Sequence, residues 1–127
     1  MDSVTHFEIP VDDPKRASAF YSKVFGWQIN QWGDQKYWMA GTTASDQNGV
    51  ATTPGAINGG LGPREGPLKA PTVTIKVANI DMALDSVKKA GGKVAAPKMP
   101  VGDMGFTAYI HDSEGNTIGL WQDTGGM

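Results

Sequence analysis

Hydrophobic and polar positions alternate over residues 4–11, which read VTHFEIPV. In an extended chain this alternation sends Phe7 and Ile9 to one side and His6 and Glu8 to the other. The pattern predicts a β-strand with an apolar face that packs in the core and a polar face that stays available for other contacts.

Residues 14–25 change to the spacing of an amphipathic helix. The apolar stripe recurs at i, i+3, i+4, i+7 and i+8 and consists of Ala17, Phe20, Tyr21, Val24 and Phe25. Asp13 suits the N-cap, Pro14 the first turn, and Gly26 the position after the last turn. The sequence therefore predicts a helix over 14–25 whose stripe packs on the apolar face of the preceding strand, with Phe20 and Val24 buried there.

The remainder of the first half predicts short strands separated by turns. The expected strands are 27–32, 36–40 and a glycine-rich segment over 55–61, with a polar loop over 42–54. The glycines of 55–61 leave room either for a ligand or for a close backbone contact.

The same order of elements returns in the second half of the chain. It predicts a strand over 71–77, a helix over 80–90, and strands over 93–96, 105–111 and 116–122. A loop containing Pro97 and Pro100 is expected after 93–96.

The two halves align without a gap between residues 6–28 and 72–94. The identical pairs are Ile9/Ile75, Val11/Val77, Ala17/Ala83, Lys23/Lys89 and Gly26/Gly92. Together with the matching element order they predict an internal duplication. We therefore expect an α+β fold in one domain, residues 1–127, with one βαβββ module over about 4–61, a connector over 62–70, and a second module over about 71–122.

Packing of each helix on its own sheet predicts an incomplete barrel with a central cleft. The polar strand faces would line this cleft, so we expect His6, Glu8, Thr72 and Thr74 to project into it. Further candidates for ligand binding are aromatic, amide or glycine positions on the neighbouring strands, namely Trp38, Asn58, Gly60, Tyr109 and Trp121.

Composition excludes several classes of protein. A net charge of −2 and the absence of a basic patch argue against a nucleic-acid partner. The chain has no cysteine and two histidines, which excludes disulfides, thiolate metal sites and a site built from several histidines of one chain. No apolar run is long enough for a membrane helix and the first residues are not a signal peptide, so we expect no membrane partner and a cytoplasmic location.

Three segments carry a resemblance to a known family. They are HFEIPVDDPKRASAFYSKVFGWQI (6–29), the turn DSEGN (112–116) and the closing strand GNTIGLWQ (115–122). On these segments the chain resembles the vicinal oxygen chelate superfamily, which includes glyoxalase I, bleomycin-resistance proteins and extradiol dioxygenases. The resemblance covers about residues 4–122 and is closest to glyoxalase-related proteins that have no assigned reaction.

The resemblance implies where a divalent metal would be bound, because metal-using members take His or Glu ligands from the first and last strand of each module. His6 occupies the first of these positions and Thr72 the equivalent one in the second module. The expected Glu falls at Gly119, and the matching segment of the first module, 57–60, has no carboxylate. We therefore expect no metal cofactor, with a weakly held divalent ion as the alternative.

Two functions remain open from the sequence. The first is a small-molecule binding protein without the usual metal, like the drug-sequestering members of the superfamily. The second is a lyase, isomerase or other small-molecule enzyme that uses His6 and Glu8 for acid–base chemistry. Glu8 could instead form an ion pair with Lys76 at the cavity mouth.

A homodimer is the expected assembly. Several large apolar residues exceed what one small pair of sheets readily covers: Trp32, Trp38, Met39 and Trp121. Exposed apolar patches of this kind usually mark an interface, and the single-chain members of the superfamily usually pair. A monomer whose loop 42–54 covers the cleft is the alternative.

Overall fold

The computed structural model describes residues 1–47 and 49–124. Two helices and eight strands lie in this part of the chain. Their order is β1 (Val4–Val11), α1 (Pro14–Phe25), β2 (Gln28–Gln31), β3 (Trp38–Gly41), β4 (Gly59–Pro63), β5 (Thr72–Lys76), α2 (Ile80–Lys89), β6 (Lys93–Val101), β7 (Gly105–His111) and β8 (Thr117–Asp123). The chain divides into two compact units, His6–Pro71 and Met1–Thr5 with Thr72–Met127.

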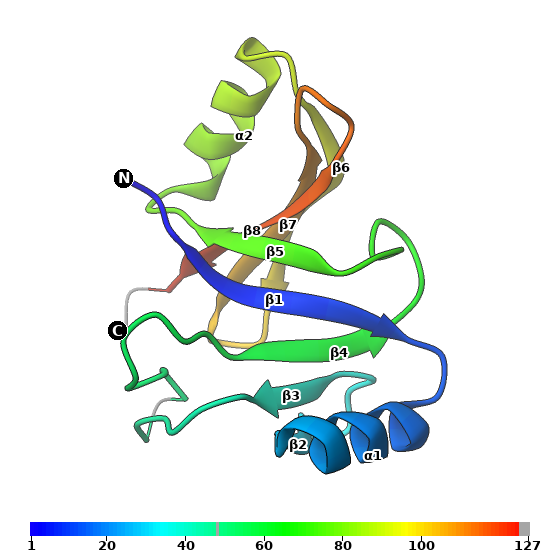
Figure 1. Ribbon diagram of the computed structural model, residues 1–127. Coiled ribbons are helices and arrows are strands. Elements are labelled where there is room, and N and C mark those ends of the chain that lie inside the picture. Colours follow the sequence, from blue (N-terminus) through cyan, green and yellow to red (C-terminus); the bar gives the residue numbers. More distant parts are fainter. Residues whose placement is uncertain (48, 125–127) are drawn as a thin grey trace. The chain divides into compact units, whose positions relative to one another are not determined.

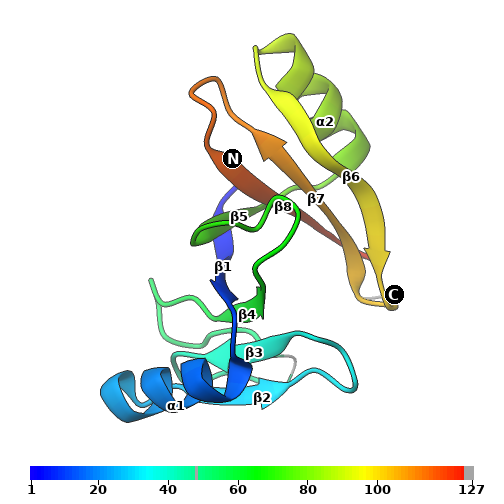
Figure 2. The same cartoon turned by 90° about the vertical axis from the view of Figure 1, so that its right-hand side faces the viewer.

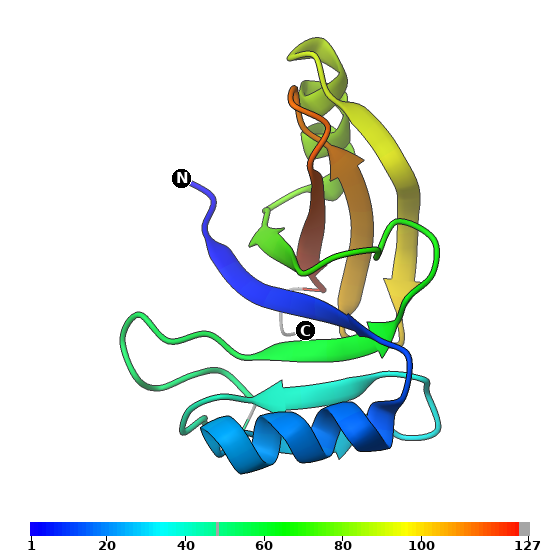
Figure 3. The ribbon, with the colours of Figure 1, turned by 45° about the vertical axis from the view of Figure 1, so that its right-hand side comes forward.

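The unit His6–Pro71 contains the strands in the order β2-β3-β4-β1, with β1 parallel to β4 and the other pairs antiparallel. Helix α1 lies beside β2 and β3 (Figures 1 and 3). Its start is fixed as the sequence predicts, since the Asp13 carboxylate accepts the backbone N–H of Arg16 at 3.1 Å. It ends at Gly26, whose φ of 74° is the left-handed conformation that glycine adopts readily.

The other unit repeats this arrangement, with the strand order β5-β8-β7-β6 and β5 parallel to β8. Helix α2 packs on β6, β7 and β8 (Figure 2). The core under α2 consists of Val77, Ile80, Ala108, Ile110 and Leu120. Residues 1–5 belong to this unit because the carbonyl of Ser3 accepts the backbone N–H of Lys76 at 3.0 Å.

The shared element order confirms the α+β fold with two βαβββ modules. The strand registers extend the equivalence of the two modules to residues beyond the aligned segments 6–28 and 72–94. Ile9 lies opposite Leu61 in one unit, and its aligned residue Ile75 lies opposite Leu120 in the other. The residue before each leucine is therefore equivalent, which pairs Gly60 with Gly119.

Strand β6 corrects one prediction. The expected loop after residue 96 is wrong, because β6 continues through Pro97 and Pro100 to Val101. Two register shifts against β7, between Val94 and Met99, absorb the irregularity. Proline is tolerated here because β6 is the outer strand of its sheet, where one edge needs no backbone N–H donors.

Helix α1 corrects a second prediction. Phe20 and Val24 are 55% and 56% exposed, so they do not cover the apolar strand face as expected. That space is filled by Trp27, which stacks on Tyr21 at 4.8 Å between ring centroids and lies 5.5 Å from the Phe7 ring. The helix therefore turns its Ala17–Tyr21 side toward the sheet.

No described helix is both long enough and apolar enough to cross a membrane. Strand β4 also differs from its expected bounds, since it begins at Gly59 and extends into the predicted connector as far as Pro63.

Candidate functional site

The polar face of β1 continues onto β4 in the unit His6–Pro71. Glu8 lies opposite Gly60 and Pro10 opposite Gly62 in the parallel register, so these residues share one face of the sheet. Phe7 lies on the other face, where its ring contacts Trp27 and Gly59. The predicted orientation of the strand, with His6 and Glu8 away from the helix, is confirmed.

Tyr37 covers the glycines of this polar face. A Cβ atom placed on Gly60 would overlap with the Tyr37 hydroxyl oxygen and with two carbons of its ring. A Cβ on Gly62 would lie 3.6 Å from Cδ2 of the same ring. The glycine-rich strand thus serves the close contact that the sequence offered as one alternative, because the ring of Tyr37 lies directly on its backbone.

His6 and Tyr37 form a hydrogen bond, with 2.9 Å between Nε2 of the imidazole and the phenolic oxygen. Burial lowers the pKa of His6, and the negative charge of Glu8 partly opposes this shift. His6 is therefore neutral at pH 7. A neutral imidazole nitrogen can accept a proton, and a phenol can both donate and accept a hydrogen bond.

Glu8 adds a buried carboxyl group two residues from His6 on the same strand face, with 8% of the residue exposed. The three side chains offer a proton acceptor, a phenolic hydroxyl and an acid–base group on one small area. This set can orient a polar substituent of a small molecule, and it can move a proton to or from that substituent.

A second polar row crosses the other unit. Thr74 lies opposite Gly119, and Gly119 lies opposite Tyr109, so the three share one face across β5, β8 and β7. A Cβ on Gly119 would lie 2.6 Å from the Thr74 hydroxyl oxygen, which occupies the space above the glycine. Thr72 and Thr74 are both buried.

Trp121 belongs to this second face because it lies opposite Lys76. Its indole N–H donates to the Asp123 carboxylate at 2.5 Å, and the other oxygen of Asp123 binds the Lys76 ammonium at 2.6 Å. These contacts fix the indole ring, and they lower the pKa of Asp123 through the two hydrogen bonds.

A family model described as the Glyoxalase/Bleomycin resistance protein/Dioxygenase superfamily matches residues 3–120. The chain belongs to this superfamily. A glyoxylase-like domain-containing protein of Didymella fabae is 29% identical, over 90% of this chain and 88% of the relative.

Several solved structures share the fold of this chain. A methylmalonyl-CoA epimerase in complex with methylmalonyl-CoA and NH4+ superposes with a TM-score of 0.67 at 14% identity, covering 98% of this chain and 96% of the other. The epimerase from Streptomyces coelicolor gives 0.66 at 15% identity, over 97% and 95% of the two chains. A hypothetical protein from Bacillus halodurans gives 0.64 at 16%, over 97% and 95%.

The residues at the ligand positions of metal-using superfamily members do not fit a divalent cation. The strand register assigns Gly60 and Gly119 to the equivalent positions near the end of each module, and Thr72 aligns with His6. Nε2 of His6 is already bonded to Tyr37. Within residues 1–47 and 49–124, no group of three or more His, Cys, Asp or Glu side chains is placed to hold a metal ion.

One predicted site residue is not brought to the polar faces. Trp38 lies opposite Leu61, on the same face as Ile9 and therefore away from Glu8. Asn58 lies just before β4, two residues before Gly60, and its side-chain amide is bonded to Thr42 and Ser45. Its oxygen accepts the backbone N–H of Thr42 at 2.9 Å, and its nitrogen donates to Ser45 at 2.7 Å.

The predicted cleft that would gather His6, Glu8, Thr72 and Thr74 concerns both units and stays a prediction. Tyr37 is the residue of the candidate site that sequence reasoning missed. The available signal was the alternation of Gly60 and Gly62, because two glycines on one strand face leave space for a flat ring.

Proposed function

We propose that the protein binds a small organic molecule at the polar face formed by His6, Glu8 and Tyr37, without a divalent metal. The observation that carries this proposal is the hydrogen bond between Tyr37 and His6 above Gly60. This bond occupies Nε2 of His6, the histidine on this face, and it holds the imidazole and the phenol together as a fixed pair of hydrogen-bonding groups. Such a pair recognises a hydroxyl, carbonyl or amide of a ligand.

Residues of the second polar face are proposed as ligand-binding residues on the same grounds. They lie on the sheet face that does not pack under the helix of their unit, and they combine hydroxyl groups with aromatic rings that suit a flat organic molecule. They are Thr72, Thr74, Tyr109 and Trp121.

A second candidate function is an enzyme of the lyase or isomerase type. It is favoured by the lowered pKa of His6, because a neutral imidazole beside a carboxyl group can take a proton from a bound substrate. The solved neighbours include methylmalonyl-CoA epimerases bound to CoA thioesters. Acyl-CoA thioesters therefore belong among the first compounds to be tested.

The test combines metal analysis with a ligand screen by thermal shift on the purified protein. We expect a metal content well below one ion per chain and an unchanged melting temperature with a chelator. Compounds that raise the melting temperature should lose this effect in His6→Gln and Tyr37→Phe. His111→Gln is the matched control, because it changes the chain's other histidine and should leave the effect intact.

One tightly held metal ion per chain would overturn the metal-free proposal. Ligands whose binding survives both His6→Gln and Tyr37→Phe would overturn the site. Each hit is then incubated with the protein and followed by NMR for a chemical change. Turnover that His6→Gln abolishes favours the enzyme, and an unchanged compound favours the binding protein.

We also propose a homodimer in which a second copy covers the last turns of α1. Val24 and Phe25 are 56% and 60% exposed there, whereas the tryptophans expected at the surface are half-buried. Exposed apolar neighbours of this kind favour an interface. Light scattering should give twice the mass of 13.5 kDa, and Val24→Glu should give a monomer while Lys15→Glu does not. A wild-type protein that is monomeric at tens of micromolar would contradict the proposal.

The cytoplasmic location stays a prediction from the sequence.

A further inference from the structure

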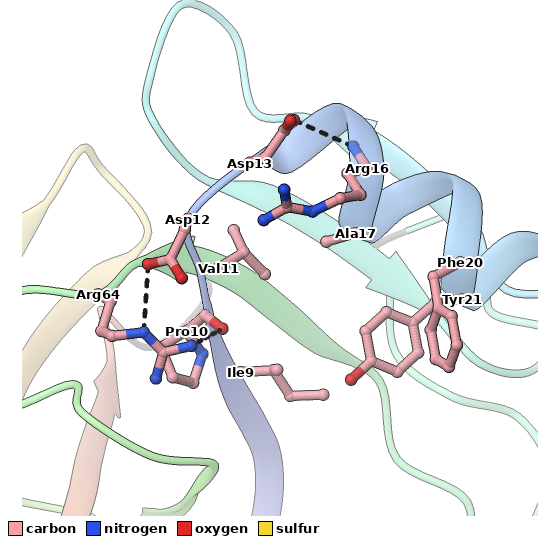
Figure 4. Close-up of a pocket in the computed structure, with 10 residues that line it drawn as sticks. All are labelled: Ile9, Pro10, Val11, Asp12, Asp13, Arg16, Ala17, Phe20, Tyr21 and Arg64. Atoms are coloured by element: carbon pink, nitrogen blue, oxygen red, sulfur yellow. Dashed lines mark hydrogen bonds and ion pairs between the residues drawn. The ribbon is translucent and has the colours of Figure 1, made fainter.

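A hollow of about 340 Å³ lies between the end of β1 and the first turns of α1, within the unit His6–Pro71 (Figure 4). Its volume falls at the lower end of the range found for small-molecule pockets. The lining residues Ile9 and Val11 belong to the β1 face opposite Glu8. The hollow is therefore distinct from the polar face of the proposed function.

One end of the hollow is apolar. Ile9 lies at its floor, and Ala17, Phe20 and Tyr21 line its helix side. Figure 4 shows the Tyr21 hydroxyl directed toward Ile9. The rings of Phe20 and Tyr21 meet edge to face at 5.2 Å, yet Phe20 stays 55% exposed. An aromatic ring bound here would gain both apolar burial and ring–ring contact.

The other end carries two arginines (Figure 4). Arg64 is held in place, since its Nε donates to Asp12 at 3.2 Å and one Nη donates to the carbonyl of Lys69 at 3.0 Å. Arg16 is different. Among the residues that the structure describes, no hydrogen bond or ion pair engages its guanidinium, although its backbone N–H is bonded to Asp13. The hollow thus has an available guanidinium at the end away from its aromatic rings.

We propose that this hollow binds an aromatic monocarboxylate, with the ring beside Phe20 and Tyr21 and the carboxylate on Arg16. A guanidinium matches a carboxylate by two parallel hydrogen bonds. Asp12 and Asp13 line the same end and repel additional negative charge. They favour a single carboxylate over a phosphate ester or a dicarboxylate.

The site does not depend on the proposed function. Its wall on β1 is the face opposite His6 and Glu8, so a ligand here needs neither side chain. Arg16 and Phe25 are nine residues apart, which places them about 13 Å apart along the helix axis. A second copy on the last turns of α1 therefore leaves the arginine end accessible, whereas Phe20 lies next to the covered residues, with its ring 6.4 Å from that of Phe25.

The test is an NMR titration of the full-length protein with 3-phenylpropionate, followed by amide shifts. We expect saturable shifts that cluster at residues 9–21 and at Arg64. The uncharged analogue 3-phenylpropanamide should bind at least about tenfold more weakly than the acid, because it lacks the charge that strengthens the hydrogen bonds to Arg16. The acid should lose affinity by a similar factor in Arg16→Gln. Lys23→Gln, a change of charge near the other end of α1, should bind like the wild type.

Three results would overturn the proposal. They are the absence of saturable shifts at millimolar ligand, equal affinity of acid and amide, and unchanged binding by Arg16→Gln. Shifts that cluster instead at His6 and Tyr37 would show that the acid binds the other face. Arg16 is exposed, so the amide spectrum of Arg16→Gln should remain that of a folded protein. Phe20→Ala is a second variant, which should lower the affinity for the acid and the amide by the same factor.

Discussion

Gly60→Ala tests the contact on which the candidate site is built. The new methyl group would overlap with the hydroxyl oxygen and two ring carbons of Tyr37. The backbone around Gly60 cannot retreat easily, because β4 is bonded to β1 on one side and β3 on the other. The ring of Tyr37 must therefore leave its place, and its hydrogen bond to His6 breaks.

The expected cost has two parts. Forcing an extra methyl group into packed space costs about 1–3 kcal/mol. Breaking the bond between Tyr37 and His6 costs about 0.5–1.5 kcal/mol. Because the displaced atoms are the far end of a side chain, part of the first cost is relieved when the ring swings away. We expect Gly60→Ala to lower the free energy of unfolding by about 2–3 kcal/mol.

The assay is urea denaturation of four proteins: wild type, Gly60→Ala, Tyr37→Ala and the double variant. Once the ring is absent the methyl group has nothing to displace, so the double variant should cost less than the sum by about 1–2 kcal/mol. Gly62→Ala is the matched control on the same strand face. Its Cβ would lie 3.3 Å from a methyl carbon of Leu68 and 3.6 Å from Tyr37, contacts that small shifts relieve.

Two results would refute the reasoning. Gly60→Ala could prove as stable as Gly62→Ala, which would mean that Tyr37 does not lie on Gly60. The two single substitutions could also add without coupling, which would mean that the methyl group and the ring do not meet. An NMR titration of His6 gives an independent check, because a displaced Tyr37 exposes the imidazole and should move its pKa upward toward the ordinary value.

Three further predictions follow from other contacts. Burial lowers the pKa of His6 in the folded protein, so the unfolded chain binds the proton more readily. Stability should therefore fall as the pH drops below about 6.5. Urea denaturation midpoints measured across this pH range should decrease with falling pH, and His6→Gln should remove this dependence. Gly105→Ala should cost about 3 kcal/mol or more in urea denaturation, because the new Cβ overlaps with the backbone carbonyl oxygen of Gln122, which cannot rotate away. Asp13→Ala should cost about 1 kcal/mol in the same assay through loss of the helix cap, and Asp13→Asn should restore most of it.

Local patterns predicted the parts of the fold that depend on local physics. The alternation over 4–11 determined which side of β1 faces the helix, and Asp13 and Gly26 determined the ends of α1. The path of β6 through two prolines could not be predicted in this way. It depends on β6 being an outer strand, and that position is a property of the assembled sheet.

The candidate site was predictable only in part, for a related reason. His6 and Glu8 follow from the alternation of one strand. Tyr37 lies in the short expected strand 36–40, but its partner His6 is 31 residues earlier in the chain, so the pairing is not visible in either segment alone. The exposure of Phe20 could not be predicted from the sequence either, because it results from Trp27 filling the space above Phe7. Long-range packing of single aromatic side chains leaves little trace in a hydrophobic pattern.

The two copies of the module use one equivalent glycine in different ways. Above Gly60 lies the ring of Tyr37, which belongs to another part of its unit, and above Gly119 lies the hydroxyl of Thr74 from the adjacent strand. A carboxylate side chain at either position would therefore displace a group that the chain already places there. The groups above the two glycines differ between the copies: the first module has the phenol of Tyr37 beside His6 and Glu8, and the second has threonine hydroxyls and aromatic rings.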